Sequence, residues 1–316
     1  MRQEIKVKKK QQKPVRHASA ACFFALSNRG LLRWMPARMY LSALWRAYFH
    51  KKLDWNNPRS FNEKIQWLKV YDKNPLYPTL ADKFAAREFI RQVIGEEYLI
   101  PLVGGPWESF DEIDISALPE RFVLKTTHDS GGVVICRDKD EFDLQSAREK
   151  LEKSLKRNYY WGGREWPYRG IKPRIIAEAY MEDASCGELP DYKFMMFGGE
   201  PRCAFVCTNR FLGNKLNVTF FDPDWNRMPF ERHYHADPQA LQKPACYDEM
   251  IRVAKQLSEG LPFLRVDLYE VDGRVYCGEL TLYPGSGLET FQPEEWDDKL
   301  GDWLELERFF PEMFPR

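Results

Sequence analysis

Two acidic residues near the C-terminal end of the chain, Asp267 and Glu279, are the strongest candidates for metal chemistry. Each lies in a run rich in β-forming residues, and an Asp-Gly turn separates the runs, which predicts a hairpin over residues 263–281. Two carboxylates and the hydroxyl of Thr281 are hard oxygen donors, which suit a Mg²⁺ ion that also holds phosphates. The alternative is an ordinary edge hairpin whose charges are only solvated.

The register of this hairpin decides whether the two carboxylates share a face. Opposed residues in an antiparallel pair point to the same side of the sheet, so Asp267 and Glu279 face together only when the loop has an odd number of residues. A three-residue loop over residues 271–273, with its glycine at positive φ, meets this condition. It pairs Arg265 with Glu279. Asp267 then lies opposite Cys277.

A glycine-rich turn between two apolar runs is a candidate phosphate-binding flap. Lys125 ends the first run, and Ser130, Gly131 and Gly132 precede the second. The Walker pattern, in which Gly-Lys-Ser/Thr opens a helix, is absent. The backbone N–H groups of residues 130–132 can instead close over the terminal phosphates of a nucleotide, and Lys125 would point its ammonium at the same phosphates. A plain hairpin turn is the alternative.

A β-rich run followed by a short apolar linker is a candidate hinge for binding adenine. The run over residues 175–178 ends in Glu178, and Tyr180, Met181 and Asp183 follow within five residues. In such a hinge, backbone groups bind the edge of the base while a nearby carboxylate takes the ribose hydroxyls. Taken alone, this pattern is weak.

The elements that would position these residues change in kind along the chain. Apolar residues at helical spacing predict helices over residues 61–71 and 79–94, and Ser60 with Glu63 resembles a capping box. From residue 121 onward, β-forming residues predominate. Helices followed by a strand-rich region indicate the α+β class. Strands are predicted over residues 98–103, 121–125, 132–136, 175–178, 192–197 and 202–207, with a helix over 144–157. The expected organisation is a disordered basic tail (1–29), a helical region (30–115), a subdomain with the flap (116–185) and a subdomain with the metal hairpin (186–316).

The charge is balanced overall but unevenly distributed. The 316 residues carry 47 Lys and Arg against 47 Asp and Glu, so no global field favours a nucleic-acid partner. Residues 1–16 hold seven basic side chains against one acid, which is typical of a disordered tail, with attraction to anionic lipid as the less favoured interpretation. The apolar run over residues 18–26 is too short to span a bilayer. We therefore expect a cytoplasmic protein whose tail can rest against the inner face of the membrane.

The seven cysteines are scattered singly, without a CxxC pair, and several lie inside apolar runs. This pattern favours buried thiols in a reducing compartment and argues against structural zinc. No Ser-His-Asp or Cys-His set is convincing, so covalent catalysis by a protein nucleophile is not expected.

The order of these features resembles the ATP-grasp superfamily, and in particular the TupA-like amidoligases of bacterial polysaccharide and teichuronopeptide biosynthesis. The resemblance covers roughly residues 50–305. It implies an ATP-grasp fold, in which two α+β subdomains hold ATP and Mg²⁺ between them, and an ATP-dependent ligase that joins a carboxylate to an amine. The motifs that carry it lie at residues 61–69, 81–87, 158–160, 164–168, 171–178 and 293–303.

Family roles carry over directly to matching positions, with two departures. Thr281 stands where many ATP-grasp enzymes have Asn, and a hydroxyl can still ligate Mg²⁺. Asp129 stands in the flap where the family pattern has Gly, and it would bring a negative charge near the triphosphate unless it faces away. The matching positions are Lys125, Glu178, Lys193, Arg265, Asp267 and Glu279.

The resemblance implies a mechanism through an acyl phosphate. Lys125 and Lys193 would hold the nucleotide phosphates, while Arg210 and Arg265 would neutralise charge on the acyl phosphate. The expected substrates are a uronic-acid carboxylate, free or within a glycan, and the amine of an amino acid, with Arg164 and Arg210 suited to an anionic acceptor. Residues 159–168, which are aromatic and glycine-hinged, could form a substrate lid, or a loop packed on the core. The oligomeric state stays open.

Three alternatives remain at this point. A glycosyltransferase would also serve polysaccharide synthesis, but it would need a Rossmann-like half that the sequence does not indicate. A sugar or small-molecule kinase could use the same fold. An inactive nucleotide-binding module is the third alternative, because of the charge of Asp129.

Overall fold

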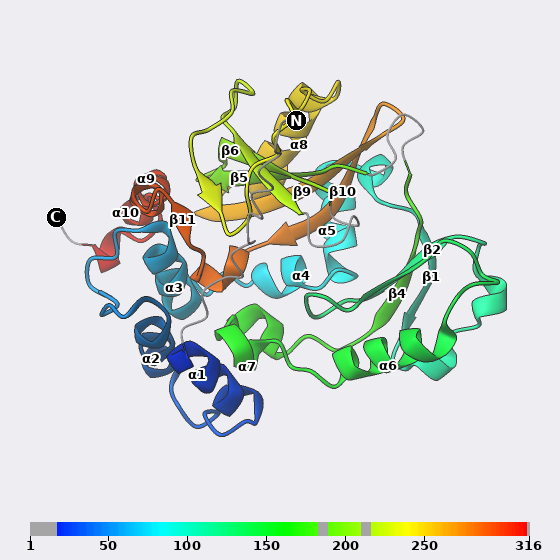
Figure 1. The fold of residues 1–316 in the computed structure, drawn as a ribbon, viewed down its shortest axis with the longest axis horizontal. Coiled ribbons are helices and arrows are strands. Elements are labelled where there is room, and N and C mark those ends of the chain that lie inside the picture. The colour runs from blue at the N-terminus through cyan, green and yellow to red at the C-terminus, as the bar shows by residue number, and fades with distance from the viewer. Residues whose placement is uncertain (1–17, 183–188, 210–215, 315–316) are drawn as a thin grey trace, which may run out of the picture.

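The computed structural model describes residues 18–182, 189–209 and 216–314, and it confirms the α+β class (Figure 1). Two antiparallel sheets dominate. The first has the order β1 (Leu102–Trp107), β4 (Ile175–Ala179), β2 (Phe122–Thr126) and β3 (Val133–Cys136). The second has the order β10 (Arg274–Thr281), β9 (Phe263–Val271), β5 (Asp191–Phe197), β6 (Glu200–Thr208) and β7 (Asn217–Phe221). A small ribbon pairs β8 (Glu231–Arg232) with β11 (Phe291–Gln292).

The first strand of the first sheet lies later in the chain than the sequence predicts. Residues 96–98 form a 3-10 turn, and the strand expected over residues 98–103 lies instead at 102–107, where it pairs with β4. The flap subdomain therefore includes part of the expected helical region 30–115. The helix α6 (Leu144–Leu155) covers this sheet and shares a small hydrophobic core with it. That core includes Phe110, Leu118, Phe122, Leu124, Ala147, Leu151 and Ile175.

The second sheet is packed against the larger core, between α8 (Tyr247–Ser258) and the helices α3 (Phe61–Tyr71) and α9 (Glu295–Trp303). The predicted capping box begins α3, because the Ser60 side chain accepts from the Glu63 backbone and the Glu63 side chain accepts from the Ser60 backbone. The ammonium of Lys64, buried in α3, donates to the carbonyls of Gly301 and Leu304 at 2.9 Å each. These bonds fix α3 against the C-terminal end of α9.

The helix predicted over residues 79–94 is interrupted, and the break has a consequence for the site. The structure has α4 (Tyr77–Ala81) and α5 (Ala85–Val93). The carboxylate of Asp82 accepts from the Phe84 backbone at 2.9 Å, while the Lys83 backbone N–H bonds the carbonyl of Thr127 at 2.9 Å. Asp82 also pairs with Arg174 at 2.8 Å. Lys83 is therefore held beside the glycine-rich flap.

The N-terminal region is helical from residue 18, so the prediction of a disordered tail over 1–29 is wrong for residues 18–28. The helix α1 (Ala18–Asn28) is followed by α2 (Ala37–Phe49), and both lie beside the short α7 (Tyr160–Gly163) (Figure 1). Residues 1–17 are outside the described part of the chain. The last helix is α10 (Leu306–Phe309). Among the helices of residues 18–182, 189–209 and 216–314, none is long and apolar enough to cross a membrane.

Candidate functional site

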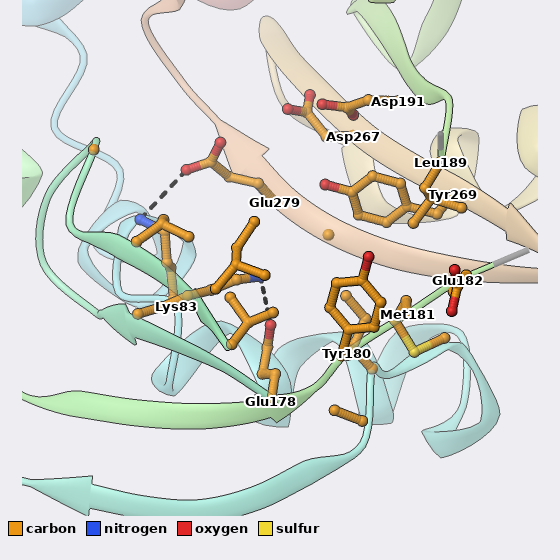
Figure 2. Close-up of a pocket in the computed structure, with 18 of the residues that line it drawn as sticks. Lys83, Glu178, Tyr180, Met181, Glu182, Leu189, Asp191, Asp267, Tyr269 and Glu279 are labelled. Carbon is orange, nitrogen blue, oxygen red and sulfur yellow. Dashed lines mark hydrogen bonds and ion pairs between the residues drawn. The ribbon is translucent and has the colours of Figure 1, made fainter. Parts of the chain in front are cut away.

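A pocket of about 410 Å³ lies between the two sheets (Figure 2). Its size is that of a typical small-molecule site. One wall comes from β2, β3, β4 and the flap, and the opposite wall comes from the hairpin β9–β10 and from the start of β5. Nine of the residues predicted from the sequence line this pocket: Lys125, Ser130, Gly131, Glu178, Tyr180, Met181, Lys193, Asp267 and Glu279.

Three predicted residues within the described part of the chain are not among those that line the pocket. Arg265 lies behind the lining and contacts two of its carboxylates. Gly132 packs under the flap, where an added Cβ would lie 1.8 Å from the Thr126 hydroxyl, so a side chain does not fit there. Thr281 lies opposite Arg265 in the hairpin ladder. Asp183 and Arg210 fall outside the described residues.

The hairpin register differs from the prediction. The loop has two residues, Asp272 at φ 49° and Gly273 at φ 73°, and the strands pair from Val271 and Arg274 onward. An irregularity at Gly278 then restores the facing of the two carboxylates, and Glu279 pairs directly with Asp267. The predicted three-residue loop and its pairing of Arg265 with Glu279 are therefore wrong. A β-bulge at Gly278 supplies the extra residue that the prediction placed in the loop.

The bulge residue must be a glycine for a steric reason. A Cβ on Gly278 would lie 2.4 Å from the Tyr269 ring, which covers this position from the paired strand. The ring of Tyr269 thereby lines the pocket, on the same side as Tyr180 and Met181 from the hinge after β4 (Figure 2). This apolar end of the pocket, with two aromatic rings, suits a flat heterocyclic base.

Asp267 is the centre of a buried charge network. Arg265 donates two hydrogen bonds to its carboxylate, at 2.6 and 2.7 Å, and Lys193 donates a third. Lys193 also pairs with Asp191 at 2.8 Å. Burial by itself would lower the pKa of Lys193, but Asp191 and Asp267 outweigh it, and the pKa is raised. The pKa of Arg265 is likewise raised by Asp267 and Glu279 despite its burial. Both cations stay charged at neutral pH.

Glu279 is the more accessible carboxylate of the pair, with 35% of its side chain exposed. It lies 3.4 Å from Lys83 (Figure 2), and 3.6 Å from Arg265. Burial raises the pKa of its carboxyl, but Lys83, Arg265 and Lys193 outweigh that effect, and the net pKa is lowered. The group is therefore an anion at neutral pH, as a metal ligand must be.

Lys125 is held on the opposite wall by a carboxylate. Its ammonium lies 2.5 Å from Glu178 on the neighbouring strand β4. The second oxygen of Glu178 pairs with Arg87 at 3.1 Å, and Arg87 also bonds the Ile100 carbonyl at 2.8 Å. Glu178 thus orients Lys125 toward the pocket, which is a different contact from the ribose binding expected of the hinge. Glu182 also lines the pocket, next to Met181, and it pairs with Arg121 (Figure 2).

The flap is anchored by buried polar groups, and only its tip is exposed. The side chain of Asp129 is buried and accepts hydrogen bonds from Thr126, at 2.5 Å, and from Ser154 of α6. Its carbonyl accepts from Lys83 at 2.5 Å. The carboxylate of Asp129 therefore faces away from the pocket, so its charge does not oppose a triphosphate there. Ser130 and Gly131 are the exposed flap residues that line the pocket.

Several residues that line the pocket were not predicted from the sequence. Lys83 and Asp191 each stand in a recognisable motif without an assigned role, and only their positions in the fold bring them to the pocket. For Tyr269 and Glu182, the sequence gives no indication other than their positions in the predicted hairpin and next to the predicted hinge. Arg137, at the end of β3, is a further lining cation.

The expected lid over residues 159–168 packs on the N-terminal helices. Arg164 is buried and donates to the carbonyl of Leu32 at 2.7 Å, with its guanidinium 4.1 Å from the Tyr40 ring centre. The prediction that Arg164 binds an anionic acceptor is therefore wrong, because its guanidinium is engaged inside the protein. Burial raises the pKa of Tyr168, and the negative charges of Glu165 and Glu279 raise it further.

The donor set fits a metal that takes part of its coordination from elsewhere. Within the described residues, no group of three or more His, Cys, Asp or Glu side chains is arranged to hold a metal ion. Asp267 and Glu279 supply two carboxylates at one edge of the pocket, and Mg²⁺ in nucleotide sites is commonly bound through one or two carboxylates plus phosphates.

A pocket between two antiparallel sheets, with a glycine flap and lysine on one wall and acidic strands on the other, is suited to binding a nucleotide with its metal ion. The chain matches the TupA-like ATP-grasp family over residues 63–305 and belongs to that family. It is therefore an ATP-grasp ligase, a class of enzymes that use ATP to join a carboxylate to an amine. No curated protein sequence matches the chain.

Solved structures with a similar arrangement are distant in sequence. D-alanine–D-alanine ligase from Bacillus anthracis, complexed with ATP, is 15% identical, with a TM-score of 0.41 over 75% of this chain and 67% of the ligase. L-amino acid ligase from Bacillus licheniformis is 17% identical, with a TM-score of 0.41 over 72% and 50%. N5-carboxyaminoimidazole ribonucleotide synthetase from Thermus thermophilus is 14% identical, with a TM-score of 0.38 over 70% and 51%. The chain spans about half the length of the last two.

Lys125→Ala is expected to weaken ATP binding without unfolding the chain. The substitution removes one charge-assisted contact worth about 1.5–3 kcal/mol, or roughly a ten- to hundredfold loss of affinity. Arg87 still compensates Glu178, so the fold should persist. Calorimetric titration with Mg-ATP measures the loss, and Lys172→Ala, at an exposed ion pair outside the pocket, is the control. Equal affinities would show that Lys125 does not contact the nucleotide.

Proposed function

We propose that the protein joins the carboxylate of a uronic acid, free or within a surface polysaccharide or its precursor, to the amine of an amino acid. One observation carries the proposal. The cations Lys125 and Lys193 and the carboxylates Asp267 and Glu279 line one pocket large enough for a nucleotide, and Arg265 supports the two carboxylates from behind. Such a set neutralises and positions phosphates, which is most of what phosphoryl transfer requires of a protein.

The proposed placement of ATP follows the chemistry of the pocket walls. The base lies at the end lined by Tyr180, Met181 and Tyr269, and Glu182 binds the ribose. The triphosphate extends toward Lys125 and the flap residues 130–132. Asp183 has no assigned part in this placement, because it lies outside the described residues.

Asp267, Glu279 and Thr281 are the proposed ligands of Mg²⁺. Asp267 already accepts three charged hydrogen bonds, so Glu279 would supply the more open oxygen. When bound, Mg²⁺ neutralises the phosphate oxygens during transfer. Thr281, opposite Arg265 in the ladder, is the least supported of the three, because it does not line the pocket.

In the proposed reaction, a carboxylate oxygen of the sugar attacks the γ-phosphorus of ATP, and the bond from that phosphorus to the β–γ bridging oxygen breaks. ADP leaves and an acyl phosphate forms. The amine nitrogen then attacks the acyl carbon, loses a proton, and inorganic phosphate leaves. Lys193 and Arg265 stabilise the charge of the transferring phosphoryl group. Arg210, which falls outside the described residues, is proposed to assist them.

The proposed setting is the cytoplasm, where ATP is available, and the proposed partners are these two substrates and no nucleic acid. For a glycan acceptor, the proposed platform for a sugar ring is the aromatic pair Tyr159 and Tyr168 of segment 159–168, whose ring centres lie 4.9 Å apart.

Trapping of the intermediate tests the reaction. With Mg-ATP and a hexuronic acid, hydroxylamine should capture the acyl phosphate as a hydroxamate, and ADP should otherwise accumulate only when an amino acid is added. ADP release without any amine, and without hydroxamate, would favour the kinase alternative. Absence of ADP with every carboxylate tried, despite ATP binding, would favour an inactive module. The glycosyltransferase alternative is disfavoured, because the chain belongs to the TupA-like ATP-grasp family.

A further inference from the structure

The segment from α1 to α2 exposes an unusual concentration of large apolar side chains. Eight large hydrophobic side chains are exposed in the described parts of the chain, and four of them lie in residues 26–39. Trp34 is 74% exposed, Leu31 56% and Met39 55%, and Leu26 is also exposed. We refer to these four residues as the apolar cluster. Grouped exposed apolar residues on a folded protein mark a surface that binds something.

The cluster lies within a long stretch that has no acidic residue. Residues 5–53 contain twelve Lys and Arg and no Asp or Glu. Residues 1–53 hold thirteen basic side chains and one acid, which leaves 34 basic against 46 acidic residues in the rest of the chain. Arg29, Arg33 and Arg38 are exposed beside the cluster. The neutral net charge therefore conceals a strongly basic N-terminal region.

The backbone that presents the cluster is firmly held. Arg164 bonds the Leu32 carbonyl, and the Tyr40 hydroxyl donates to the Gly162 carbonyl at 2.9 Å. The Ser27 hydroxyl donates to the Trp161 carbonyl at 3.2 Å. The segment is thus fastened to α7 at both of its ends, and α7 and the turn lie at the same edge of the molecule (Figure 1). The exposure of the cluster is a built feature of the fold and does not come from a frayed end.

We propose that the apolar cluster docks the protein on an anionic phospholipid surface. Trp34, Leu31 and Met39 would enter the boundary between headgroups and acyl chains, where tryptophan is favoured. The neighbouring arginines would contact anionic headgroups, each adding to the attraction. A nucleic acid would bind the arginines but would leave the exposed apolar side chains in water. A basic protein partner is disfavoured because residues 5–53 contain no acidic residue. This inference does not rest on the proposed function.

Vesicle flotation with the full chain tests the proposal. The protein should rise with vesicles of phosphatidylcholine and phosphatidylglycerol but not with phosphatidylcholine alone. The double variant Leu31→Ser/Trp34→Ser should lower the partition coefficient by about tenfold or more, because two inserted apolar side chains are lost. Since both positions are exposed, the variant should stay folded, and thermal melting checks this. Leu144→Ser, at an exposed leucine on α6, is the matched control and should bind as the parent does.

Two further measurements distinguish lipid docking by the apolar cluster from binding by the basic tail and from self-association. The first measurement uses the tail variant Lys8→Gln/Lys9→Gln/Lys10→Gln. When Leu31→Ser/Trp34→Ser is added to the tail variant, vesicle binding should fall further. If the tail variant alone abolishes flotation and Leu31→Ser/Trp34→Ser has no effect in the parent protein, the basic tail is the lipid-binding element and the proposal fails. Size-exclusion chromatography without vesicles is the second measurement. A dimer that Trp34→Ser converts to a monomer would assign the cluster to self-association. Parent protein that does not rise with the anionic vesicles also overturns the proposal.

Discussion

Glu279→Gln is expected to reduce turnover by at least about a hundredfold while leaving the chain folded. The substitution removes the most open carboxylate of the proposed Mg²⁺ site, and the loss of one electrostatic contact to a reacting group commonly costs this much. The effect on stability should be no more than about 1 kcal/mol, because the side chain is partly exposed and its ion pairs are screened. ADP release under saturating Mg-ATP and thermal unfolding measure the two effects.

The matched control for this prediction is Glu270→Gln, on the same hairpin but outside the pocket. Glu270 accepts a hydrogen bond from the Cys246 backbone, which a glutamine can also accept. It should retain normal turnover. If Glu279→Gln retained it too, the metal would have to be bound elsewhere, and the assignment of Asp267 would lose its main support.

Lys193→Met is expected to be the most destabilising single substitution in the site, by about 3–5 kcal/mol. Lys193 is buried between Asp191 and Asp267, so the variant leaves buried negative charge with less compensation. Arg265 still pairs with Asp267, so that carboxylate keeps part of its charge compensation in the variant. Urea unfolding measures the free-energy difference, and Lys255→Met, which breaks an exposed pair with Glu200, should cost far less.

The pH dependence of this difference follows from the raised pKa of Lys193. A lysine whose folded pKa lies above its unfolded value of about 10.4 contributes its full stabilisation below that value, and the contribution is lost only as pH rises through the folded pKa. The difference between parent and variant should therefore be flat from about pH 7 to about pH 10. A cost below about 1 kcal/mol would mean that water enters and solvates the two carboxylates.

Features that depend on nearby residues could be predicted from the sequence alone. The capping box of α3 needs only Ser60 and Glu63, three residues apart, and it is present. The strands carrying Lys125 and Glu178 follow from short β-rich runs, and both residues line the pocket. The Asp-Gly turn predicted a hairpin, and Gly273 has the positive φ expected of it. In each case the determining interactions lie within a few residues.

The direction in which side chains point was decided by the tertiary structure. The register shift at Gly278, where the Tyr269 ring leaves no room for a side chain, sets the facing of Glu279, which no count of loop residues could supply. Asp129 turns away from the phosphates because Thr126 and Ser154 bond it from the far side. Lys83 reaches the site through a helix break bonded to Thr127. These outcomes depend on partners from distant segments, and burial makes each partner's position matter, since an unpaired polar group in the interior is costly.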